Sequence, residues 1–312
     1  SPHASAYEST KLWYFDWDTT RNLRHADPEV RRMLIDAFVF WVREFDVDGY
    51  RIDAAWGPRE RHPTFWPELV TALRRVKPDV FLLAEASAQD GYYQTHGFDA
   101  AYDWTEELGK WSWEAAFVEP ARAGKVLGER LRAGAPTSPD RVLRFVNNND
   151  TGERFVSRHG VALARVAAVL QHALPGLALV YTGDEVCAEY LPYEDPPPIS
   201  WEDRCALRAH YRTLAELREL PALRDGALVT LDSGADAVLA FGRDAGADGK
   251  VLAVLNFADA ATVEVPLPAE LRGLAGPPLR DLLTGRAVDA EPTAGGVRLK
   301  LEPREALLLA PR

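Results

Sequence analysis

The sequence predicts an α/β domain with about five parallel strands, followed by an antiparallel β-sandwich. In the first part of the 312-residue chain, short apolar runs alternate with amphipathic helical patterns, which is typical of parallel strands covered by helices. Near residue 222 the pattern changes to short strands joined by turns, and all nine tryptophans lie before that point. We therefore expect two domains, residues 1–222 and residues 223–312.

The first predicted helix precedes the first strand. Asp27 can cap this helix, and Pro28 suits its first position because the ring presets the helical backbone angle. One apolar stripe then recurs at helical spacing, formed by Leu34, Phe38, Trp41 and Phe45. We expect this stripe, including Trp41, to face the core.

A strand, a helix and a second strand follow within about 40 residues, the length of a βαβ unit. The strand is centred on Ile52, a second amphipathic helix runs over residues 65–76, and the apolar run 80–85 comes directly after it. Further strands are predicted at residues 98–102, 141–150 and 177–181, with a helix over 161–172. All five strands can end at one rim of a parallel sheet.

The last part of the chain has the pattern of an antiparallel sandwich. Its predicted strands are residues 227–231, 237–241, 250–257, 262–267, 296–302 and 306–310. The segment 246–250, "GADGK", carries the Asp-Gly signal of a hairpin.

The charge of the chain narrows the choice of partners. Its formal net charge of -11 would repel nucleic acid and anionic membranes, so we expect neither as a partner. No apolar run approaches the roughly 20 residues that cross a bilayer, and the first residues do not resemble a signal peptide. We expect a soluble protein, either cytoplasmic or secreted after a signal has been removed.

Two cysteines, Cys187 and Cys205, are too few for a disulfide framework or a zinc site. A single bridge between them is the alternative, but we expect both to remain unpaired. We expect no metal site.

Three predicted strands end in carboxylates, at Asp53, Glu85 and Asp150. Each acid alone is typical of a solvated loop or a helix cap. Together they indicate a cluster, because Arg51 lies two positions before Asp53 on the same side of the strand and can hold that carboxylate ionised. Two carboxyl groups in contrasting environments are what cleavage of a glycosidic bond requires. The alternative interpretation is that Arg51 forms only a structural ion pair at the end of the strand.

Four segments, in this order and spacing, resemble the later signature regions of the α-amylase superfamily, glycoside hydrolase family 13. They are residues 48–55 "DGYRIDAA", 81–87 "FLLAEAS", 145–150 "FVNNND" and 175–185 "PGLALVYTGDE". Residues 26–53 also resemble the family helix that leads into the nucleophile strand, and residues 251–267 resemble its C-terminal β-sandwich.

The resemblance implies a retaining mechanism on an α-glucosidic bond of an α-glucan or maltooligosaccharide, by hydrolysis or transglycosylation. It implies that Asp53 is the nucleophile and that Glu85 is the acid and then the base. Asp150 would stabilise the transition state by holding sugar hydroxyls, and Arg51 matches the arginine beside the nucleophile. No cofactor is implied.

The chain departs from the family pattern at two places. Asn149 stands where the family has histidine, so the residue can donate a hydrogen bond but cannot carry a charge. Trp56 and Gly57 stand where the family often has Lys-His, which leaves the family calcium site in doubt. Trp56 is a candidate for stacking on a sugar ring, or it is a loop residue packed into the core.

The first family signature region has no counterpart in this chain, so the resemblance implies a partial TIM-barrel-like domain. The five strands correspond to the fourth through eighth of the family barrel, and residues 11–26 resemble the exit from its inserted domain. Open sheet edges invite association. We therefore expect a homo-oligomer or a complementing chain, and the alternative function is a catalytically silent or impaired scaffold.

Overall fold

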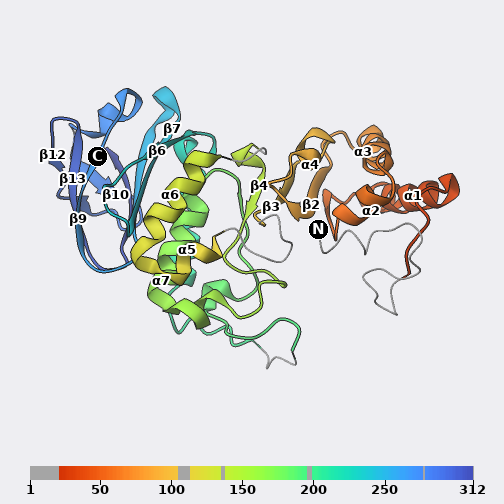
Figure 1. Cartoon of the computed structure of the whole chain (residues 1–312), viewed down its shortest axis with the longest axis horizontal. Coiled ribbons are helices and arrows are strands. Elements are labelled where there is room, and N and C mark those ends of the chain that lie inside the picture. The colour runs from red at the N-terminus through yellow and green to blue at the C-terminus, as the bar shows by residue number, and fades with distance from the viewer. Residues whose placement is uncertain (1–20, 105–112, 135–137, 195–198, 277, 312) are drawn as a thin grey trace. The chain divides into compact units, whose positions relative to one another are not determined.

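The computed structural model describes residues 21–104, 113–134, 138–194, 199–276 and 278–311 (Figure 1). The part of the resemblance at residues 11–20 therefore lies outside the described residues. The chain forms two compact units, which are described separately. The first contains residues 21–104 and 138–142, and the second contains the remaining described residues.

The first unit is a layer of parallel strands with helices between them. Its elements are α1 (Pro28–Phe45), β1 (Gly49–Ile52), α2 (Trp56–Arg61), α3 (Phe65–Val76), β2 (Phe81–Ser87), α4 (Tyr92–Thr95) and β3 (Ala100–Tyr102). The pairs β1–β2 and β2–β3 are both parallel. In Figure 1 α1 and α3 lie side by side, and their core residues include Val42, Leu69 and Leu73. The predicted βαβ unit is confirmed.

Helix α1 begins where its sequence predicts, but only Leu34 and Phe38 of the predicted stripe pack against the core. The Asp27 side chain accepts a hydrogen bond from the Glu29 N–H at its start. Val39 and Val42 are the buried residues of this helix, whereas Trp41 is 50% exposed and Phe45 is 61% exposed. The prediction for Trp41 was wrong because α1 is apolar on two adjoining faces, and the valines occupy the face that meets the core.

The second unit begins with helices and a short parallel pair of strands. Its elements before the sandwich are α5 (Glu114–Val118), α6 (Ala123–Ala133), α7 (Phe155–Ala173), β5 (Leu177–Ala178), α8 (Arg208–Leu217) and α9 (Pro221–Arg224). Strand β4 (Val142–Arg144) runs parallel to β5, through the pair Leu143 and Leu177. Both strands are shorter than predicted, because loops begin directly after Arg144 and Ala178. The prediction of five parallel strands is confirmed.

The C-terminal part is an antiparallel sandwich, as predicted. Its strands are β6 (Ala227–Leu231), β7 (Val238–Asp244), β8 (Lys250–Asn256), β9 (Ala261–Pro266), β10 (Leu279–Asp281), β11 (Ala287–Val288), β12 (Glu291–Pro292), β13 (Gly296–Leu301) and β14 (Ala306–Pro311). The sheet orders are β11-β10-β14-β8-β7-β6 and β12-β13-β9. Buried apolar side chains from both sheets form one core, including Leu252 and Val265. The domain boundary at residue 222 stays a prediction.

Helix α6 packs closely on β7 because a glycine faces the strand. A Cβ atom on Gly124 would lie 2.3 Å from the backbone carbon of Val238, so a larger residue would push the helix away. The N–H of Lys125 also donates to the carbonyl of Asp236 at 2.9 Å. These contacts join α6 to the sandwich within the second unit.

The two cysteines form a disulfide bridge, Cys187–Cys205. The expectation that they remain unpaired was wrong, because the loop between them brings together two residues that sequence spacing alone does not pair. Within the described part of the chain, no helix is long and apolar enough to span a bilayer.

Two buried histidines predict that acid destabilises the fold. Burial lowers the pKa of His172 and of His210 from 6.5 to about 4. Between these pH values the unfolded chain binds protons at the two rings and the folded chain does not, so stability falls as the pH drops from 6.5 towards 4. Urea midpoints of the unaltered chain and of His172→Gln, compared from pH 7.5 to 4.5, should show a weaker fall for the variant. Equal slopes would contradict the assignment.

Candidate active site

Asp53 and Glu85 lie at the same rim of the parallel layer. Ile52, the last residue of β1, pairs with Ala84 of β2, so the residues that follow them come out at the same level. Asp53 is the first residue after β1, and Glu85 lies within β2. The carboxyl ends of parallel strands are where loops assemble reactive groups. The structure therefore brings these two predicted site residues together within the first unit.

Arg51 joins the two carboxylates. Its Nη1 contacts Asp53 Oδ1 at 2.5 Å, and its Nη2 contacts Glu85 Oε1 at 2.8 Å. The third face of the guanidinium donates from Nε to the hydroxyl of Tyr102 at 3.0 Å. Burial alone would lower the pKa of Arg51, but the hydrogen bonds to Tyr102 and Asp53 and the charge of Glu85 raise it. The arginine is thus a permanent cation between two acids.

The two carboxylates differ in their surroundings. The Asp53 side chain is 82% exposed, whereas that of Glu85 is only 14% exposed. An exposed carboxylate can approach a substrate atom directly, and an enclosed one is shielded from water. The predicted contrast in environment is therefore present in the geometry of the pair.

Glu85 also holds the turn that follows Asp53. The N–H of Ala54 donates to Glu85 Oε2 at 2.6 Å, and the N–H of Ala55 donates to the Glu85 carbonyl at 3.2 Å. Ala54 has φ +43°, a left-handed conformation that costs a residue with a Cβ about 1–2 kcal/mol. A hydrogen bond to a carboxylate contributes about 1.5–3 kcal/mol, which is enough to offset that cost. The strained turn therefore depends on Glu85.

The third predicted acid, Asp150, lies in the second unit. The hydroxyl of Tyr193 donates to Asp150 Oδ1 at 2.8 Å and accepts a hydrogen bond from Asn149 Nδ2 at 2.7 Å. Asp150 N–H donates to Asn148 Oδ1 at 2.8 Å, which fixes the backbone of this turn. Its convergence with Asp53 and Glu85 around one pocket stays a prediction.

A buried ion pair lies beneath this turn. Arg154 Nη2 contacts Asp184 Oδ1 at 2.6 Å, and both side chains are almost fully buried. Asn147 Nδ2 donates to the same carboxylate oxygen at 2.8 Å, and Tyr181 N–H donates to Oδ2 at 3.0 Å. Burial raises the pKa of Asp184 to about 6, although Arg154 opposes the shift. Every contact serves the packing of the loop, which favours a structural role for Asp184.

The tryptophan candidates differ in exposure. Trp56 opens α2 and is half-buried, and it packs against the core of the first unit, so stacking on a sugar ring stays a prediction for this residue. Trp104, which follows β3, is only 1% exposed and is therefore closed to a ligand ring.

Sequence reasoning missed two tyrosines that contact site residues. Tyr102 is the last residue of β3 and binds Arg51, so its place at a strand end was a usable signal. Tyr193 lies in a loop with no periodic pattern, and no sequence signal connected it with Asp150. No group of three or more His, Cys, Asp or Glu side chains among the described residues could hold a metal ion.

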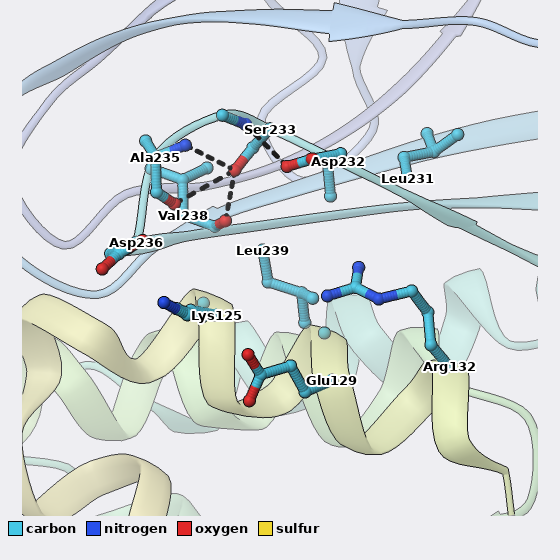
Figure 2. A pocket seen from close by; sticks show the side chains of 14 residues that line it. Lys125, Glu129, Arg132, Leu231, Asp232, Ser233, Ala235, Asp236, Val238 and Leu239 are labelled. Carbon is cyan, nitrogen blue, oxygen red and sulfur yellow. Dashed lines mark hydrogen bonds between the residues drawn. The ribbon is translucent and has the colours of Figure 1, made fainter.

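A cavity of about 300 Å³ lies between α6 and the β6–β7 connection (Figure 2). The helix side of the cavity is lined by Lys125, Glu129 and Arg132. On the opposite side, the Ser233 hydroxyl hydrogen-bonds to the carbonyls of Ala235 and Val238 and so holds the loop. No aromatic ring lines it, and it contains none of the predicted site residues. Because sugar sites commonly use an aromatic face, this cavity does not fit the predicted substrate.

Comparison with known proteins identifies one family. The family model described as "Alpha amylase, catalytic domain" matches residues 5–206. The chain is 29% identical over 291 residues to a cyclomaltodextrinase of Geobacillus thermopakistaniensis, which covers 86% of this chain and 46% of that protein. It is 30% identical over 281 residues to the alpha-amylase MalA of Haloarcula japonica, covering 84% of this chain and 40% of that one.

Solved structures show the same fold. The crystal structure of the alpha-amylase from Geobacillus thermoleovorans, in complex with acarbose, matches with a TM-score of 0.77 at 23% identity. The match covers 98% of this chain and 69% of that one. The chain thus spans less than half the length of the two curated relatives named above.

Proposed function

The chain belongs to the alpha-amylase family of catalytic domains, and on that premise we propose that it is a retaining α-glycoside hydrolase or transglycosylase acting on α-glucans or maltooligosaccharides. The observation that carries the proposal is the pair Asp53 and Glu85, held on one guanidinium at the rim of the parallel layer. A related cyclomaltodextrinase and an alpha-amylase support the substrate class by their names.

In the first step Asp53 attacks the anomeric carbon and forms a covalent glycosyl-enzyme, while Glu85 gives its proton to the leaving oxygen. In the second step Glu85 removes a proton from water or from an acceptor sugar, which displaces Asp53. Two inversions at one carbon leave its configuration unchanged. The exposure of Asp53 supports its role as nucleophile, and the shielding of Glu85 suits a group that exchanges its proton with substrate.

Arg51 orients Asp53 through a charge-assisted hydrogen bond and keeps it from turning away from the substrate. The third carboxylate, Asp150, would hold sugar hydroxyls in the cleavage subsite, with Asn149 as a neighbouring hydrogen-bond donor. Trp56 would stack on a sugar ring, since the residue is only partly buried.

The proposal is tested by a product profile on starch, maltooligosaccharides, trehalose and sucrose, with the anomeric configuration of fresh products followed by NMR. Retained α-configuration on a maltooligosaccharide is the expected result. Inverted products, or cleavage confined to trehalose or sucrose, would contradict it.

A second proposal concerns the open side of the first unit. No strand pairs with the outer edge of β1 among the residues that the structure describes. Helix α1 contacts β1 through Phe38 and Tyr50. The same helix exposes Phe40, Trp41 and Phe45, which contact one another with ring centroids 4.9 to 6.0 Å apart and are 49%, 50% and 61% exposed. An unpaired parallel edge next to an apolar helix face is a surface for another strand and helix.

We propose that a complementing polypeptide, which supplies a parallel strand and a helix, covers this surface. The length of family members supports this occupant, because the chain matches only 69% of the Geobacillus thermoleovorans alpha-amylase while 98% of its own length is matched. As long as this surface is uncovered, the site at Asp53 and Glu85 would be impaired. The alternative of a silent or impaired scaffold therefore applies to the uncovered chain.

Without that polypeptide the chain is expected to associate as its concentration rises, because the aromatic face is exposed. Light scattering should show weaker association for the double variant Trp41→Lys/Phe45→Lys. The control Val118→Lys, which changes another exposed apolar residue, should associate as the unaltered chain does. A monomer at all concentrations would contradict the proposal, and a discrete dimer would identify a second copy as the occupant.

A further inference from the structure

We propose that Tyr193 is a positioning residue for Asp150 and that the Cys187–Cys205 bridge holds the loop that carries it. The inference rests on the proposed function, because it takes Asp150 as the group that holds sugar hydroxyls. Tyr193 lies between the two cysteines in sequence and reaches back across 43 positions to Asp150. All of these residues belong to the second unit.

The Tyr193 hydroxyl connects two candidate substrate-binding side chains. It donates to Asp150 Oδ1 at 2.8 Å and accepts from Asn149 Nδ2 at 2.7 Å. One hydroxyl can donate one hydrogen bond and accept others, so both contacts form at the same time. The direction of each bond follows from its chemistry, because a carboxylate only accepts. Tyr193 therefore sets the orientation of both side chains together.

The backbone near Asp150 is held independently of Tyr193. Asn148 Oδ1 accepts from the Asp150 N–H at 2.8 Å, and the Thr151 hydroxyl accepts from the Asn148 N–H at 3.0 Å and donates to the Asn148 carbonyl at 3.0 Å. These contacts fix where the Cα of Asp150 lies, but they leave its carboxylate free to rotate. Tyr193 supplies a contact to that carboxylate.

The exposure of Tyr193 argues against a packing role. The residue is 77% exposed, so removing its hydroxyl takes little from the core of the unit. A side chain with so little packing is located chiefly by its polar contacts and by the loop beneath it. The conformation of the loop that carries Tyr193 therefore decides whether its hydroxyl keeps the hydrogen bond to Asp150.

The bridge ties that loop to packed structure at both ends. Cys187 follows a turn in which its N–H donates to the Asp184 carbonyl at 3.3 Å, and Asp184 is itself paired with Arg154. At the other end, Arg165 of α7 donates to the Cys205 carbonyl at 3.3 Å. The cysteines are 18 positions apart, so the bond closes a short loop and limits the freedom of its described residues 188–194, which include Tyr193.

The test replaces Tyr193 with phenylalanine, which keeps the ring and removes both hydrogen bonds. Misplacing a binding group by about 1 Å can cost on the order of 100-fold, so we expect kcat/KM on a maltooligosaccharide to fall roughly 10- to 100-fold with an unchanged melting temperature. Tyr190→Phe is the matched control, because Tyr190 lies in the same loop and its hydroxyl donates to the Thr182 carbonyl instead. This control should keep the activity of the unaltered chain.

A double-mutant cycle separates positioning from a general effect on the loop. If Tyr193 acts through Asp150, Tyr193→Phe should add little to the loss already caused by Asp150→Asn. The variant without the bridge, Cys187→Ser/Cys205→Ser, should likewise lose activity. Adding Tyr193→Phe to this variant should cause a smaller loss than Tyr193→Phe causes in the unaltered chain. Losses that simply multiply, or full activity of Tyr193→Phe, would overturn the inference.

The outcomes also distinguish this inference from the proposed function. An inactive Asp150→Asn with a fully active Tyr193→Phe removes the inference and leaves the function standing. A fully active Asp150→Asn removes the role of Asp150 and the inference with it. Calorimetry of acarbose binding compares Asp150→Asn and Tyr193→Phe in the same way without turnover. An unaltered chain that neither binds acarbose nor cleaves maltooligosaccharides would overturn both the inference and the proposed function.

Discussion

Asp53→Asn is expected to lower kcat/KM on a nitrophenyl maltooligosaccharide by at least about 10⁴-fold, the scale seen when one member of a catalytic set is removed. The amide is a poor nucleophile and cannot stabilise a positive charge at the anomeric carbon. Its size is nearly that of the carboxylate, and the residue is 82% exposed, so the fold should remain intact. Initial rates and a thermal melt measure the two effects separately.

Asp48→Asn is the matched control for this variant. Asp48 is an exposed aspartate at the opposite end of β1, where it pairs with Lys77 at 2.9 Å. It lies away from the carboxyl rim, so its replacement should leave the rate within about twofold, which is the scale of a surface substitution. Equal residual activity of the unaltered chain and Asp53→Asn would end the assignment of Asp53 as nucleophile.

Glu85→Gln is expected to lower activity in a way that depends on the leaving group. Loss of a general acid typically costs about 10²- to 10⁴-fold, and the loss should be largest for a natural sugar leaving group, which needs a proton. A leaving group that departs as a stable anion should be cleaved with a much smaller loss. Added azide should then restore turnover and yield an α-glycosyl azide, because azide needs no base to attack the glycosyl-enzyme.

The control for Glu85→Gln must address the turn that this residue holds. Glutamine keeps an acceptor oxygen for the Ala54 N–H, so the strained turn should persist, and a melting temperature close to that of the unaltered chain checks this. Glu60→Gln, an exposed glutamate on α2, should leave all rates unchanged. The same loss with good and poor leaving groups, and no azide product, would contradict the acid/base role.

The sequence predicted those parts of the fold that follow from local patterns. Asp27 and Pro28 located the start of α1 because a cap and a first-turn proline each act within one turn of helix. Asp53 was found because it directly follows the strand β1, and Glu85 because it closes an apolar run, although β2 continues beyond it to Ser87. The pairing register of β1 and β2 then brings the two acids together, as expected for parallel neighbours.

The features that the sequence could not predict depend on the packing of distant segments. Trp41 belongs to a regular apolar stripe, but the core accepts Val39 and Val42 instead, and only the neighbouring elements decide which face is covered. The disulfide and the Tyr193 contact both depend on the course of one loop, which carries no periodic signal.

Arg51 illustrates the limit within the site itself. Its pairing with Asp53 follows from their spacing of two on one strand, and this pairing was predicted. Its second contact, with Glu85, requires the neighbouring strand in a particular register and was not predicted. One cation therefore serves both acids, which couples the position of the nucleophile to that of the proton donor.

The most direct test of the central claim is to trap the covalent intermediate on Asp53. A 5-fluoro maltosyl fluoride should form a glycosyl-enzyme that breaks down slowly, because the ring fluorine destabilises both transition states while the fluoride leaves without a proton. Mass spectrometry of the intact protein and of its peptides should show one sugar on the peptide that contains Asp53, and none in Asp53→Asn. A label on another residue, or turnover of the fluoride without any label, would contradict the account.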